Sequence, residues 1–67
     1  MNYNRIKYAG LKAEMARQGH TQFTLSALLG IPQSGISKRL QGFVVWRKNE
    51  IDKICEFYGK SYEELFK

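Results

Sequence analysis

Glycine and proline divide the chain of 67 residues into short segments, and this division constrains the fold more than any other feature. Between these residues the apolar side chains follow the spacing of helices, and no segment alternates convincingly as a strand would. We therefore expect five short helices. Their expected bounds are Asn4 to Gln18, Gln22 to Leu29, Gln33 to Gln41, about Arg47 to Tyr58, and a last turn after Ser61.

The expected core follows from helical spacing. The clearest stripe comprises Ile51, Ile54, Cys55 and Tyr58, at positions i, i+3, i+4 and i+7 of one helix. Tyr8, Leu11 and Met15 form a similar inward face on the first helix. A chain of this length can bury one small core. We predict a compact, all-α, five-helix domain that spans residues 1–67.

Charge is distributed unevenly along the chain. Residues 1–49 carry eight basic side chains against the single acid Glu14, whereas residues 50–67 carry three basic and five acidic side chains. The net charge is therefore +7 in the first part and −2 in the second. A basic surface can simply be solvated, but this pattern also suits a polyanion bound by the first part.

The sequence lacks the features of several other protein classes. Cys55 has no second cysteine for a disulfide or zinc site, His20 has no titratable partner at catalytic spacing, and the Glu63-Glu64 pair fits a helix start. No apolar run could span a membrane, and the N-terminus lacks the apolar core of a signal peptide. We expect a cytoplasmic protein without enzymatic activity, metal, cofactor or membrane contact.

The segment from Gln22 to Gly42 carries the functional signal. Ser26 is small enough for two helices to approach closely, and Gly30 can adopt the positive φ that the turn requires. Pro32 cannot continue the preceding helix and is well suited to open the next one. Leu25, Leu29, Ile31 and Ile36 would hold the pair together from beneath. The pattern predicts a helix-turn-helix at about residues 22–41.

Several short motifs occur along the chain at a characteristic spacing: Thr21-Gln22, Gly30-Ile31, Gln33 to Ser37, Gly42, Gly59, and Ser61 to Leu65. In these features nearly the whole chain resembles the lambda-type repressor and Cro helix-turn-helix family. Leu11-Lys12 with Met15, and the run from Lys38 to Gly42, look most like small prophage-encoded Cro-like regulators. The resemblance implies a sequence-specific regulator of transcription that binds double-stranded operator DNA and occludes a promoter.

The residues expected to contact DNA follow from this resemblance and from side-chain chemistry. Glutamine can bond adenine, lysine can bond guanine, and serine adapts to several bases. The predicted base contacts are Gln33, Ser34, Ser37 and Lys38. The predicted phosphate contacts are Thr21, Gln22, Gln41, Arg47 and Lys48. Because one helix reads few base pairs, we expect two copies on an inverted repeat, with weak or no association in free solution.

Three side chains depart from the expected pattern or allow two interpretations. Arg39 stands where many family members have an apolar residue, so Leu40 could take the core position and the end of the helix could be rotated. Phe23 is apolar where many members expose a charge, and we favour local packing over a partner contact. Trp46 could pack beneath its loop or lie against the DNA backbone, and packing is again favoured.

A second function of a different class stays open. Small phage regulators of this fold can act as antirepressors, which bind a partner repressor protein rather than DNA. The acidic and aromatic C-terminal third could provide the surface for such a partner, through Glu56, Phe57, Tyr58, Tyr62 and Phe66.

Overall fold

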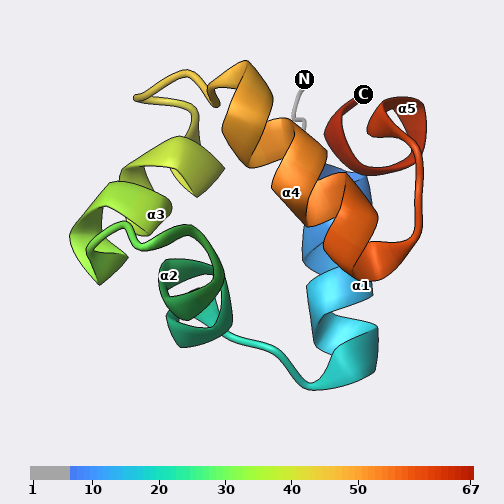
Figure 1. Cartoon of the computed structure of the whole chain (residues 1–67), viewed down its shortest axis with the longest axis horizontal. Helices are drawn as coiled ribbons and strands as arrows, with labels where there is room; N and C mark the ends of the chain where they lie inside the picture. The colour runs from blue at the N-terminus through green and yellow to red at the C-terminus, as the bar shows by residue number, and fades with distance from the viewer. Residues whose placement is uncertain (1–6) are drawn as a thin grey trace, which may run out of the picture.

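The computed structural model describes residues 7–67, and this part of the chain contains five α-helices and no strand (Figure 1). The helices are α1 (Ala9–Gln18), α2 (Gln22–Leu29), α3 (Gln33–Gln41), α4 (Lys48–Tyr58) and α5 (Tyr62–Phe66). In Figure 1, α2 and α3 lie on one side of the molecule, and α1, α4 and α5 lie on the other. The predicted all-α fold with five helices is confirmed.

Capping interactions determine where α2 begins and ends. The Thr21 hydroxyl accepts a hydrogen bond from the Phe23 N–H at 3.2 Å, and the Thr24 hydroxyl accepts one from the Thr21 N–H at 3.2 Å. These bonds satisfy amide groups that a helix start otherwise leaves without partners. Gly30, with φ of 69°, ends the helix in the left-handed region. The predicted bounds and N-cap of α2 are confirmed.

A compact turn joins α2 to α3. The Ser26 hydroxyl donates to the Ile31 carbonyl at 2.5 Å, which ties the turn to the middle of α2. Pro32 then serves as the N-cap of α3, and its carbonyl accepts the Ile36 N–H at 3.1 Å. Leu25 and Ile36 are fully buried beneath the two helices. A small residue at position 26 therefore allows close packing and also supplies a hydrogen bond.

The core gathers side chains from all five helices and from the connection between α3 and α4. Its buried apolar members are Leu11, Met15, Leu25, Ile36, Leu40, Trp46, Ile54, Leu65 and Phe66. The predicted members Tyr8, Leu29, Ile31, Ile51, Cys55 and Tyr58 pack against this core but are only partly buried. These side chains form the rim of the core, because a chain of this size cannot enclose all of them.

The start of α1 differs from the sequence prediction. The expected start at Asn4 lies outside the described residues, but Tyr8 has φ of 56° and precedes the first helical residue, Ala9. A helix cannot run through this left-handed position. The Tyr8 ring packs edge-on against Trp46 and Phe66, with centroid distances of 6.3 and 5.9 Å. Predicting Tyr8 as helical was wrong, because its place is set by aromatic packing with distant residues.

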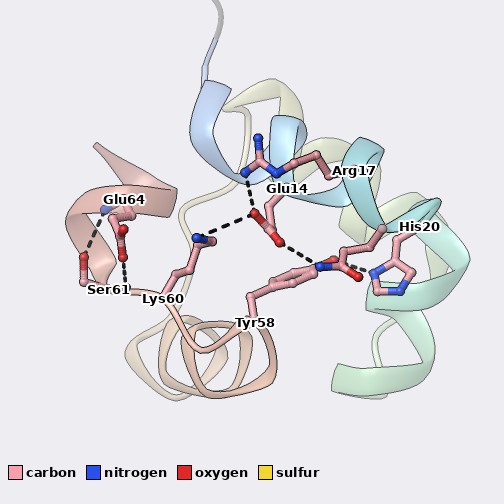
Figure 2. A network of polar contacts seen from close by, with 8 residues as sticks. Glu14, Arg17, His20, Tyr58, Lys60, Ser61 and Glu64 are labelled. Carbon is pink, nitrogen blue, oxygen red and sulfur yellow. Dashed lines mark hydrogen bonds and ion pairs between the residues drawn. The ribbon is translucent and has the colours of Figure 1, made fainter.

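Helices α1 and α5 pack together at unusually short range. A Cβ added at Gly10 would lie 1.9 Å from the carbonyl oxygen of Glu64, so only glycine fits there. A capping box opens α5: the Ser61 hydroxyl accepts from the Glu64 N–H at 3.2 Å, and the Ser61 N–H donates to Glu64 Oε1 at 2.9 Å (Figure 2). This box fixes the first turn of α5, and the Glu64 carbonyl in that turn faces Gly10 of α1.

A polar network connects the end of α4 to α1 and to the start of α2 (Figure 2). The buried carboxylate of Glu14 accepts hydrogen bonds from Gln18, at 2.9 Å, and from Arg17, and Lys60 Nζ lies 4.0 Å from it. The bond from Gln18, followed by that from Arg17, lowers the pKa of Glu14. His20 Nδ1 lies 2.8 Å from the Tyr58 hydroxyl. The His20 contact fixes the turn that precedes Thr21.

Candidate nucleic-acid interface

The four predicted base-contacting side chains share one face of α3. Gln33, Ser34 and Lys38 are exposed and Ser37 is half-buried, whereas Ile36 and Leu40 are buried in the core. With 3.6 residues per turn, positions i, i+4, i+1 and i+5 span an arc of about 140° around the helix axis, so the four side chains lie on one broad face. Among residues 7–67, the side chains of Gln33, Ser34 and Lys38 have no hydrogen-bond or ion-pair partner. They are available to an external ligand.

Arg39 braces α3 against α4. Its guanidinium donates to both carboxylate oxygens of Glu50, at 3.1 and 3.3 Å, and to the Gly35 carbonyl at 3.1 Å. Leu40 occupies the core position, as the alternative interpretation proposed, and only 6% of it is exposed. The α3 helix is therefore oriented by a nearly buried ion pair as well as by apolar packing. Sequence reasoning missed the partner of Arg39, although Glu50 occurs at capping-box spacing after Arg47.

Glu50 serves two structural purposes at once. It accepts the Arg47 N–H at 2.9 Å, which caps α4, and it holds the guanidinium of Arg39. Burial alone would raise the pKa of Glu50, but the hydrogen bonds from Arg47 and Arg39 outweigh burial and leave that pKa below its ordinary value. The carboxylate is therefore charged at neutral pH and matches the charge of Arg39.

Three predicted phosphate contacts lie together with one predicted base contact. Thr21, Gln22, Ser37 and Gln41 line a shallow cleft of about 590 Å³ between α1, α2 and α3. Lys12 of α1 lines the same cleft, although the sequence did not predict it as a DNA contact. Gln41 Nε2 donates to the Ser37 hydroxyl at 2.9 Å and to the Ser37 carbonyl at 3.2 Å. Ser37 is thus held by Gln41, in contrast to the three unengaged side chains of the outer face.

The other two predicted phosphate contacts lie at the start of α4. Arg47 is its N-cap and Lys48 its first residue, and both side chains are exposed. Lys48 Nζ lies 3.1 Å from Asp52 in an exposed ion pair. Lys7 adds a cation near the end of α3, because its Cε lies 3.1 Å from the place of a Cβ on Gly42. No local pattern pointed to Lys7, since tertiary folding brings it there.

The two aromatic side chains left open by the sequence behave differently. Trp46 is 5% exposed and packs edge-on against Tyr8 and Phe66, so the packing interpretation is confirmed. Phe23 is 68% exposed, so the expectation that it packs locally was wrong. Phe23 and Leu25 are two residues apart, which places them on nearly opposite sides of α2. Because Leu25 points into the core, Phe23 must point outward.

His20 and Cys55, the other titratable side chains considered from the sequence, pack against neighbouring residues of the fold. His20 packs beside Phe57 and Tyr58 in addition to its contact with the Tyr58 hydroxyl. Burial, and then the charge of Asp52, raises the pKa of the half-buried Cys55 thiol. Among residues 7–67 no three His, Cys, Asp or Glu side chains are grouped as a metal site would require. Within the same range, no helix is both long and apolar enough to cross a membrane.

Two short helices joined by a tight turn, with an unengaged polar face on the second helix, define a helix-turn-helix DNA-binding protein. Residues 10–67 match the family model described as the Cro/C1-type HTH DNA-binding domain, and the chain belongs to this family. Comparisons with curated proteins and with solved structures find no significant match. The family supports DNA binding by this chain and gives no support to the protein-binding alternative.

Proposed function

We propose that the chain is a sequence-specific regulator of transcription that binds operator DNA and occludes a promoter. The observation that carries this proposal is the outer face of α3, where Gln33, Ser34 and Lys38 are exposed and have no partner among residues 7–67. With Ser37 on the same face, these side chains offer donors and acceptors suited to base edges in the major groove.

Phosphate contacts would accompany base reading from two groups of residues beside α3. Thr21, Gln22 and Gln41 line the cleft between α3 and α1, and Arg47 and Lys48 follow the connection after the C-terminal end of α3. Contacts of this kind set the register of a protein on the duplex without reading its sequence. The cationic residues among them account for part of the net positive charge of residues 1–49.

Specific recognition would use two copies of the chain on an inverted repeat. A single recognition helix reads too few base pairs for a unique genomic site, and two half-sites about one helical turn apart supply the rest. An operator target places the protein in the cytoplasm, where we propose that it represses transcription by occupying the promoter.

Selection from random duplex DNA, followed by salt titration on the selected site, tests this function. We expect an inverted repeat and a log–log slope of several units, since each neutralised phosphate contributes about −0.9. Footprinting should show two protected half-sites. A slope near zero and no enriched sequence would overturn the proposal. Saturation at one copy on a single half-site would contradict only the paired arrangement.

A further inference from the structure

The connection between α3 and α4 exposes two large apolar side chains. Phe43 is 77% exposed and Val45 is 81% exposed, the highest values among the large apolar residues described. Figure 1 shows this connection projecting beyond the ends of both helices. Isolated exposed apolar residues are common on proteins. A pair on one short connection beside a candidate DNA-reading helix is a more specific arrangement.

The connection is anchored at both ends. Gly42, with φ of 90°, ends α3, and the Lys38 carbonyl accepts the N–H groups of Phe43, at 2.9 Å, and Val44, at 3.4 Å. At its other end the buried ring of Trp46 fixes the chain against the core. The backbone around Phe43 therefore folds onto the turn of α3 that carries Lys38. Little ordering of the backbone would be required on binding, which favours affinity.

The charges around this apolar pair identify the kind of partner. Residues 33–49 contain Lys38, Arg39, Arg47 and Lys48 and no acidic residue. Arg39 is paired with Glu50, but Lys38 and Arg47 are exposed, and Lys7 approaches from the N-terminal side over Gly42. A protein surface that combines exposed apolar side chains with unpaired cations is complementary to a partner that combines phosphates with hydrocarbon. The backbone and groove walls of a DNA duplex have this composition.

We propose that Phe43 and Val45 make apolar contact with the DNA duplex beside the bases read by α3, and thereby supply a part of the affinity that does not depend on salt. This inference rests on the proposed DNA binding. The carbons contacted belong to deoxyribose or to the methyl group of thymine, both of which lie along the groove next to the phosphates. The cations around the pair supply the salt-dependent part.

The test compares the full chain with a Phe43→Ser/Val45→Ser variant on the selected site over a range of salt concentrations. We expect the variant to bind about tenfold more weakly at every salt concentration, since removal of apolar contact is not screened. The salt slope should equal that of the unaltered protein, because no charge is removed. Replacement of flanking thymines by uracils distinguishes the two carbon sources: weaker binding indicates thymine methyls, and unchanged binding indicates deoxyribose.

Phe57→Ser is the control, because Phe57 is another exposed aromatic residue, with 46% exposure, but lies at the end of α4 next to Glu56. It should bind DNA as the unaltered protein does. Equal binding by the Phe43→Ser/Val45→Ser variant would overturn the inference. So would a loss of binding that sedimentation equilibrium traces to weaker self-association, since the pair would then serve a protein contact. If the unaltered protein shows no DNA binding, the proposed function itself fails.

Discussion

The α2–α3 pair and the α1–α5 pair are both made of short helices, but they leave opposite kinds of surface. Between α1 and α5 the backbones approach so closely that Gly10 has no room for a Cβ beside Glu64. On α3 the side chains of Gln33, Ser34 and Lys38 point away from the core and bind nothing among residues 7–67. The α1–α5 pair therefore contributes to the stability of the fold, and the outer face of α3 is available for recognition of a partner.

The largest change in the free energy of unfolding should come from Gly10→Ala, which would place a methyl group in the contact between α1 and α5. In an exposed helix, glycine to alanine stabilises by about 1 kcal/mol. Gly10→Ala should instead destabilise the fold by about 3 kcal/mol, because the new methyl group would overlap a backbone carbonyl that cannot rotate away. Urea denaturation monitored by circular dichroism measures this change. An increase in stability would show that the two helices are not in close contact.

Gly35→Ala in α3 is the matched comparison for that substitution. A Cβ at Gly35 would meet the ends of side chains, Ile31 Cγ2 at 2.9 Å and Arg39 Nη1 at 3.3 Å. Both atoms can move by rotation about side-chain bonds, so the loss should be smaller than at Gly10. Equal losses at the two glycines would remove the distinction between the two helix pairs.

A loss of about 2 kcal/mol is expected when Glu50 is replaced by glutamine, because Arg39 would keep its charge in a nearly buried position without an anionic partner. The effect should depend on pH. Since the pKa of Glu50 is lowered in the folded state, its contribution is present above the unfolded pKa of about 4.3 and is lost as pH falls through the folded value.

Unfolding of both proteins at several pH values checks this dependence. The difference in stability between the unaltered protein and Glu50→Gln should be constant near pH 7 and shrink below about pH 4, where the carboxyl becomes protonated. Glu14 and Glu64, whose pKa values are also lowered, remain in both proteins and cancel in the comparison. A difference that does not change with pH would show that the charge of Glu50 is not what stabilises the fold.

Substitution on the free face of α3 should have the opposite result, with binding changed and folding preserved. Gln33→Ala should cost about 1–3 kcal/mol on the selected site and relax the preference at one base position. Its effect on unfolding should stay within about 0.5 kcal/mol, because the side chain is exposed and has no partner among residues 7–67. Repeating the selection with the variant measures the preference. An unchanged preferred sequence would show that Gln33 does not read a base.

The two helix pairs also differ in how well the sequence predicts them. The bounds of α2 and α3 follow from signals within a few residues, namely Thr21 as cap, Gly30 at the turn and Gly42 at the end. The contact between Gly10 and Glu64 joins opposite ends of the chain, and no local pattern encodes it. The same reason explains the failure at Tyr8, whose backbone follows from aromatic packing with Trp46 and Phe66.

The candidate interface shows the same division between local and long-range information. Helical spacing alone groups Gln33, Ser34, Ser37 and Lys38 on one face, and the structure shows that face turned outward. The Arg39–Glu50 pair and the approach of Lys7 to Gly42 required the tertiary structure. The contacts of individual side chains with bases or phosphates remain predictions. They depend on the DNA partner, and the sequence patterns that determine the fold carry no information about it.

The smallest expected effects concern Lys48, which forms an ion pair with Asp52 and is also a proposed phosphate contact. The ion pair with Asp52 is exposed on both sides and contributes at most about 1 kcal/mol to folding. Lys48→Ala should weaken binding to all sequences equally and make the salt slope shallower by about one.

Asp52→Asn frees Lys48 and removes a negative charge close to the DNA, so it should strengthen binding by less than about 1 kcal/mol. Salt titrations of both variants on one duplex measure these changes. If neither variant changes the salt slope or the affinity for DNA, Lys48 does not contact phosphate, and the interface ends before α4.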